Sequence, residues 1–168
     1  MDKVLSEIDS DKLPLDLKKV LEDFDPETAD LKNLRAIDDS LVESLYSFAF
    51  GFYEAGKYQE ALNFFILLTA VRRKDGRFWK GLGATFQLLK RYPEAVDAYS
   101  MAAFMDEKEQ DPYTHFHAAE CLYSMNEFKR AIQALKSVKA LTKGKEKYYA
   151  LNKRVDVLGK MWKKLNII

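Results

Sequence analysis

The fold of this chain is decided by residues 79–102, which read WKGLGATFQLLKRYPEAVDAYSMA. The apolar and small residues of the first half are spaced i, i+3, i+4, i+7 and those of the second half i, i+4, i+7, so each set lies on one face of a helix. These residues are Trp79, Leu82, Gly83 and Phe86, followed by Ala95, Tyr99 and Ala102. Pro93 suits a helix start, where its missing N–H donor is harmless. The stretch predicts two antiparallel helices that pack on each other.

The same pattern occurs three times along the chain, because Ala61, Ala95 and Ala131 lie 34 and 36 residues apart in matching surroundings. Aligned on these alanines, the first repeat supplies Leu45, Phe48, Ala49, Phe52, Ala61, Phe65 and Leu68, and the third supplies His115, Ala118, Ala119, Leu122, Ala131, Leu135 and Val138. A recurrence of this length predicts a helical repeat. We expect helices near 41–54, 58–72, 77–90, 93–105, 112–125 and 128–141, in repeats spanning about 42–75, 76–109 and 112–145.

These slots match the tetratricopeptide (TPR) pattern W-x2-L-G-x2-Y followed by A-x3-F. The chain therefore resembles a three-repeat TPR array, and the predicted fold class is an all-α helical-repeat solenoid over residues 41–142. An acidic segment with an amphipathic helix precedes it at 1–40, and a basic amphipathic capping helix follows at 143–168. One departure from the pattern is Met125-Asn126, which stands where a glycine-containing turn is expected.

Length and composition agree with one compact domain, since 168 residues with 48% hydrophobic content can bury a sizeable core. Met1-Asp2-Lys3 opens the chain without an apolar signal region, and the longest apolar run, Phe64 to Leu68, is too short to cross a bilayer. The single cysteine, Cys121, cannot form an internal disulfide. These features predict a soluble, unexported protein of the reducing bacterial cytosol.

Charge is divided unevenly between the two ends of the chain. Residues 1–40 carry twelve acidic and six basic side chains, a net charge of −6, whereas residues 129–168 carry twelve basic and two acidic side chains, a net charge of +10. In the basic end, apolar residues recur at helical spacing: Tyr148, Leu151, Val155, Leu158, Trp162 and Leu165. We expect this helix to cap the last repeat. The alternatives are contacts with nucleic acid, with an acidic partner, or with the acidic N-terminus of a second copy.

A second apolar stripe lies in the acidic end, on a short helix predicted to begin near Pro14. The stripe consists of Leu13, Leu17, Val20, Leu21 and Phe24. An apolar stripe on a tethered helix needs a surface to cover. It caps the first repeat or pairs with another protomer, and the sequence leaves both open.

Stacked repeats align one face of each first helix into a concave groove. Residues directly after the first, third and fourth pattern slots form the stripe that faces it. They are Tyr46, Phe50, Tyr53, Lys80, Ala84, Gln87, Phe116, Glu120 and Tyr123. Five of the nine are aromatic, which predicts pockets for an extended apolar peptide. We expect Arg77 and Lys80 to orient the peptide, Glu120 to accept a hydrogen bond from its backbone, and His117 to line the groove. The alternative is that a neighbouring helix or a dimer partner shields some of these rings.

Three stretches resemble the class II type III secretion chaperones, which hold translocator proteins in the bacterial cytosol. They are residues 45–50 running on to 53–58 (LYSFAF and YEAGKY), residues 77–84 (RFWKGLGA), and residues 117–122 (HAAECL), the last after a lengthened connection at 106–112. The resemblance implies a non-enzymatic, ATP-independent chaperone that binds a short Pro/Leu-containing segment of a pore-forming translocator in the concave groove. It also implies a homodimer formed through the N-terminal helix.

Other functions have less support in the sequence. The runner-up is a general TPR scaffold or a heat-shock co-chaperone. Such a co-chaperone clamps a terminal carboxylate between converging cationic and amide side chains. In the first repeat, this chain has Tyr46 and Phe50 at the positions where the clamp would need such groups. His115 and His117 point to nearly opposite sides of a helix, which leaves only His117 and Cys121 on one face, too few ligands for zinc. We therefore expect no catalytic residues, no metal and no cofactor.

Overall fold

The computed structural model describes residues 24–25, 30–31, 37–106 and 110–164. They form two compact units, one ending at Lys74 and the other beginning at Asp75. The predicted all-helical repeat fold is confirmed. Leu13, Leu17, Val20 and Leu21 lie outside the described residues, so their assignment to a dimer interface stays a prediction.

The first unit contains two very short strands and the helices of the first repeat. Strand β1 (Phe24–Asp25) pairs antiparallel with β2 (Asp30–Leu31), with Phe24 opposite Leu31. The expectation that the N-terminal helix includes Phe24 is therefore wrong. Pro26 disfavours helical backbone at Asp25, so a helix in this segment would not continue past Phe24.

Helices α3 (Asp39–Glu54) and α4 (Tyr58–Val71) pack on each other through the predicted apolar slots. Leu45, Ala49, Ala61 and Leu68 are completely buried. Asp38 caps α3, because its carboxylate accepts a hydrogen bond from the Leu41 amide at 2.8 Å. The first repeat is thus a helix pair with its own core.

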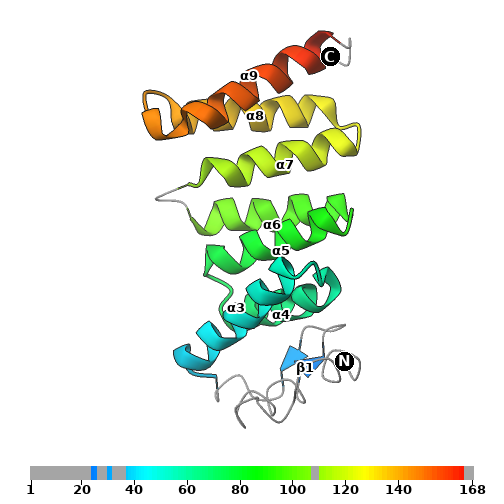
Figure 1. Ribbon diagram of the computed structural model, residues 1–168, viewed down its shortest axis with the longest axis vertical. Coiled ribbons are helices and arrows are strands. Elements are labelled where there is room, and N and C mark those ends of the chain that lie inside the picture. Colours follow the sequence, from blue (N-terminus) through cyan, green and yellow to red (C-terminus); the bar gives the residue numbers. More distant parts are fainter. Residues whose placement is uncertain (1–23, 26–29, 32–36, 107–109, 165–168) are drawn as a thin grey trace. The chain divides into compact units, whose positions relative to one another are not determined.

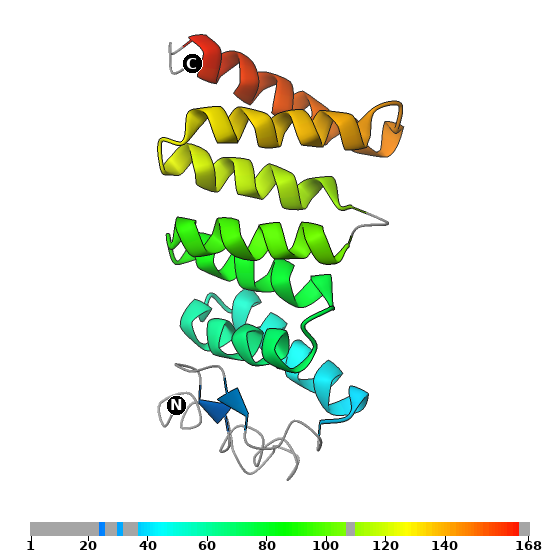
Figure 2. The ribbon, with the colours of Figure 1, turned by 180° about the vertical axis from the view of Figure 1, so that it is seen from behind.

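The second unit contains the remaining helices, which lie side by side in chain order when seen from either side (Figures 1 and 2). They are α5 (Gly76–Leu88), α6 (Tyr92–Met105), α7 (Pro112–Ser124), α8 (Phe128–Thr142), the short 3-10 helix η3 (Glu146–Tyr148) and α9 (Tyr149–Lys164). Asp75 and Asp111 cap α5 and α7 through hydrogen bonds from the amides of Arg77 and Tyr113. Every predicted repeat helix agrees with the observed one to within two residues at each end.

The C-terminal helix begins later than expected, at Tyr149 instead of residue 143. Gly144 has a φ of +71°, outside the helical range, and the backbone then forms η3 before α9 starts. Leu151, Val155 and Trp162 of α9 are buried, as the predicted apolar stripe requires. None of the helices in the described part of the chain is long and apolar enough to cross a membrane.

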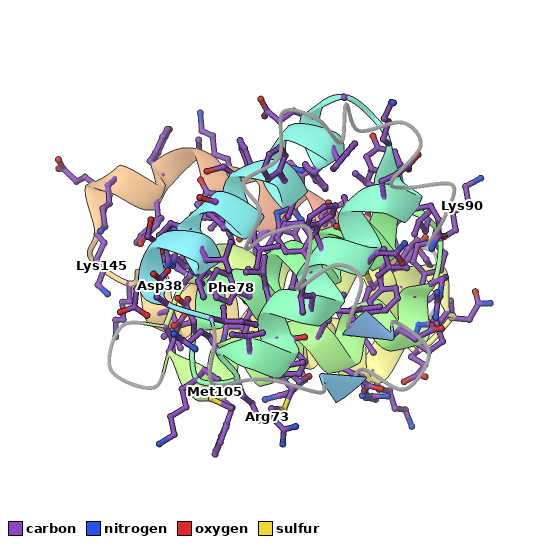
Figure 3. All side chains as sticks on the ribbon, turned by 90° about the horizontal axis from the view of Figure 1, so that it is seen from below. Asp38, Arg73, Phe78, Lys90, Met105 and Lys145 are labelled. Carbon is purple, nitrogen blue, oxygen red and sulfur yellow. The ribbon has the colours of Figure 1, made fainter. Side chains whose placement is uncertain are left out.

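The turn inside each repeat uses the same backbone conformation at the same position. Gly56, Lys90 and Asn126 have φ values of +76°, +60° and +62°, and each stands five residues before its repeat's alanine. Asn126 thus replaces the expected glycine at this turn. Asparagine tolerates the left-handed backbone conformation well. Lys90 takes the same left-handed conformation, although lysine does not tolerate it as asparagine does. The side chain of Lys90 points away from the helices (Figure 3).

We expect Lys90→Gly to raise the free energy of unfolding by roughly 0.5–1 kcal/mol, because left-handed backbone is unfavourable for residues with a Cβ. Asn126→Gly is the matched control and should change stability by less, roughly 0.5 kcal/mol or below. Urea unfolding of the two variants measures the difference. A loss of stability in Lys90→Gly would contradict the strain at this turn.

Gly83 allows α5 and α6 to approach closely. A Cβ built on Gly83 would lie 2.8 Å from Cδ1 and 2.9 Å from Cε1 of Tyr99. Tyr99 cannot easily withdraw, because it is buried and its hydroxyl donates a hydrogen bond to Gln87 Oε1 at 2.8 Å. The small residue predicted at this slot is therefore required by the helix packing.

Gly83→Ala should lower the free energy of unfolding by about 1–3 kcal/mol, the usual effect of overpacking. Gly51→Ala serves as the control, since a Cβ on this exposed residue of α3 meets nothing within 4 Å. That change should stabilise the helix by up to about 1 kcal/mol. Thermal unfolding followed by circular dichroism measures both changes, and equal midpoints for the two variants would count against the proposed crowding.

Candidate peptide-binding surfaces

Helix α3 of the first unit carries a face of neighbouring aromatic rings. Tyr46 lies 6.4 Å from Phe50 and 6.4 Å from Phe65 between ring centroids, and Tyr53 contacts Tyr58 at 5.8 Å. Phe65 is buried, whereas Phe50 is 47% exposed. Burial, with smaller contributions from Tyr58 and Glu54, raises the pKa of Tyr53, so its hydroxyl stays protonated at neutral pH. We call Tyr46, Phe50 and Tyr53 the α3 aromatic face.

In the second unit, a polar network centred on Glu120 links α5, α6, α7 and α9. Glu120 Oε2 lies 2.9 Å from His117 Nδ1 and 3.4 Å from Gln87 Nε2, and its Oε1 lies 3.5 Å from an Arg154 guanidinium nitrogen. Tyr99 extends the network by donating to Gln87. The structure thus brings three of the predicted groove residues together, and it pairs the Glu120 carboxylate with groups of the chain itself.

The two predicted cationic residues also have partners within this unit. Arg77 donates to Asp75, with a shortest N–O distance of 2.7 Å. Lys80 Nζ lies 3.3 Å from Asp106 and 3.7 Å from Asp111. Because acidic side chains already neutralise both cations, this surface gives little support to a clamp for a terminal carboxylate.

Phe116 is the clear exception among the predicted groove residues, because its side chain is completely buried. The expectation that Phe116 forms an exposed part of the groove is wrong. Helix α9 accounts for part of this cover: the Arg154 guanidinium carbon lies 4.6 Å from the centroid of the Phe116 ring. Tyr123 is partly covered in the same way by Trp162, whose ring stacks on it at 4.4 Å with an interplanar angle of 9°.

Comparisons with known proteins place the chain in a family. The tetratricopeptide repeat family matches residues 42–75 and 78–109. Low calcium response locus protein H of Yersinia pestis is 39% identical over 123 residues, which cover 73% of this chain and 72% of that protein. The translocator chaperone SycD of Yersinia enterocolitica, solved in complex with a peptide of the translocator YopD, is 36% identical with a TM-score of 0.72, over 79% of this chain and 98% of that one.

This chain belongs to the type III secretion translocator chaperones. PcrH of Pseudomonas aeruginosa, solved with the chaperone-binding region of PopD, is 32% identical with a TM-score of 0.73, over 79% of this chain and 98% of that one. SycD was also solved as an alternative dimer, with 35% identity and a TM-score of 0.71, over 78% of this chain and 98% of that one. The family predicted from three sequence stretches is confirmed.

Four residues that contact the predicted groove residues were not predicted to do so from the sequence: Tyr99, Tyr113, Arg154 and Trp162. The rings of Tyr99 and Tyr113 both stack with the His117 ring, at centroid distances of 6.0 Å and 6.5 Å. Arg154 belongs to the basic helix that the sequence predicts to cap the last repeat. The alternation of basic and apolar residues there could not show which cation would lie on Phe116.

Two further residues of α7 were considered as metal ligands: His115, which is half-buried, and Cys121, which is completely buried. Burial lowers the pKa of His115, against an opposing effect of Asp111, so this side chain favours the neutral form. Burial, and secondarily the charge of Glu120, raises the pKa of the Cys121 thiol to about 12, which keeps it protonated at neutral pH. Within the described ranges, no three His, Cys, Asp or Glu side chains group so that they could hold a metal ion.

Proposed function

We propose that this chaperone binds an extended apolar segment of a translocator protein and keeps that protein competent for secretion. The α3 aromatic face is the observation that carries the proposal, since the partly exposed Phe50 ring adjoins Tyr46 on one helix face. Such exposed rings suit apolar anchors of a partner better than they suit solvent. The translocator complexes of SycD and PcrH support the same assignment.

The second unit carries a separate, more polar surface, which we propose as a further contact for the translocator. Ala84 offers a small half-buried position on α5, and Gln87, His117, Glu120 and Tyr123 offer hydrogen-bonding groups and one ring edge. Arg77 and Lys80, whose charges are balanced by Asp75, Asp106 and Asp111, orient carbonyl groups of the translocator. Buried Phe116 supports this surface through its contacts with His117 and Arg154, which both lie within hydrogen-bonding distance of Glu120.

The affinity for an isolated segment should be modest. Each apolar anchor contributes about 1.5–3 kcal/mol, and ordering a disordered segment opposes binding by roughly 2–5 kcal/mol. A dissociation constant on the order of 10⁻⁶ M or weaker follows for a short peptide. Weak contacts of this kind allow the translocator to be released before export. Binding and release of this kind need no catalytic group. The proposal places the chaperone in the bacterial cytosol, as a homodimer.

Co-purification with each translocator encoded in the same genome tests this proposal. The tested variant is Tyr46→Ala/Phe50→Ala, which should weaken translocator binding by about tenfold or more, because two anchors are lost. Phe104→Ala is the matched control, since it truncates a ring that is 62% exposed on α6, outside both proposed surfaces. Equal recovery of the translocator with both variants would exclude the α3 aromatic face as the anchor site.

A further inference from the structure

A groove of about 410 Å³ lies between α8 and α9, on residues that play no part in the proposed translocator surfaces. Its floor is apolar and its rim is mostly basic. The lining residues are Ile132, Leu135, Val155 and Gly159, with Lys136, Lys139, Asp156 and Lys160. We call this the α8–α9 groove.

The rim of the groove carries uncompensated positive charge. Lys139 forms an ion pair with Asp156 at 2.7 Å. Lys136 and Lys160 are exposed, and no acidic side chain in the described part of the chain pairs with either of them. An occupant that combines apolar side chains with carboxylates would cover the floor and neutralise the rim at once.

The chain itself contains a segment with this chemistry. Residues 20–25 read Val-Leu-Glu-Asp-Phe-Asp, with three apolar and three acidic residues and no basic one. We propose that the α8–α9 groove binds this acidic stretch of a second copy of the chain. Two copies exchange the stretch reciprocally, so that one symmetric dimer fills two grooves. This exchange does not require translocator binding, but it rests on the homodimer proposed above.

The charge pairing is tested by reversal and rescue in the full-length chain. Lys136→Glu/Lys160→Glu should weaken self-association at low ionic strength by about tenfold, measured by sedimentation equilibrium. Adding Glu22→Lys/Asp23→Lys to the same chain should restore the dissociation constant to within about threefold. Lys143→Glu/Lys145→Glu, with the same charge change on the exposed loop outside the groove, should have an effect below about twofold. A chain that is monomeric at every concentration, or a reversal without rescue, would overturn the proposal.

Cross-linking distinguishes a second copy from the chain's own N-terminus. Glu22→Cys and Lys160→Cys are made in separate chains, mixed, and treated with a bismaleimide, while buried Cys121 with its raised thiol pKa stays unreactive. We expect a covalent dimer only in the mixture. A chain carrying both cysteines that cross-links only within itself would overturn the assignment to a second copy. Circular dichroism of each variant confirms that the helices remain folded.

Discussion

Phe116→Ala will lower the free energy of unfolding by about 3–5 kcal/mol, which is the range for removing a fully buried aromatic ring. Phe116 has no exposed surface, and it makes an edge contact with His117 at 5.6 Å and a cation–π contact with Arg154 at 4.6 Å. Truncation leaves a cavity beneath the Glu120 network and removes the support of Arg154. Urea denaturation followed by circular dichroism measures the change.

Phe50→Ala is the matched control for Phe116→Ala, because it removes the same ring from a residue that is 47% exposed. Its effect on stability should stay below about 1 kcal/mol. If Phe116→Ala is as mild as Phe50→Ala, then Phe116 is not part of the core. The contrast also decides how translocator binding is tested, because a variant that loses the fold cannot report on a peptide contact.

Trp162→Ala should have the second large effect, a loss of up to about 3–5 kcal/mol. Trp162 is 2% exposed and stacks in parallel on Tyr123, which links the end of α9 to α7. Without this ring, the last turns of α9 should open locally before the rest of the unit unfolds. Hydrogen exchange resolved along the chain measures the loss of protection in α9.

Two further variants distinguish the effect of losing the Trp162 ring from the effect of changing other groups near it. Met161→Ala changes the neighbouring residue, which is 45% exposed, and should alter stability by less than about 1 kcal/mol. Trp162→Phe keeps an aromatic ring and removes the indole N–H, which is buried without a hydrogen-bond partner among the described residues. It should therefore recover most of the stability that alanine loses. Unchanged protection of α9 in Trp162→Ala would show that the stacking on Tyr123 does not hold the helix.

The self-association proposed for the α8–α9 groove and the translocator binding proposed for the α3 aromatic face use different residues. The charge-reversed variant Lys136→Glu/Lys160→Glu keeps Tyr46 and Phe50. The variant Tyr46→Ala/Phe50→Ala keeps both lysines. Measuring both readouts on both variants therefore shows whether dimer formation and translocator binding are independent. A coupled loss would indicate that the dimer is the binding form.

The repeat helices, their turns and the family could be predicted from sequence, because each rests on local spacing. The slots around Ala61, Ala95 and Ala131 determine which face of each helix is apolar, and the observed helix ends follow within two residues. Asn126 and Lys90 show that a turn position is maintained by the repeat even when glycine is absent. The exposed ring of Phe50 was also predictable, since a stripe next to the buried face normally stays accessible.

Tertiary structure alone decided how accessible Phe116, Tyr123 and Glu120 are to a bound peptide. The same stripe rule that predicts exposure for Phe50 fails for Phe116, because α9 brings Arg154 over it from 38 positions further along the chain. Which cation of a basic helix lies on which ring depends on how that helix packs, and the spacing within either helix carries no information about this. Sequence therefore determined the helices and their apolar faces, whereas packing between distant helices determined which predicted groove residues remain accessible.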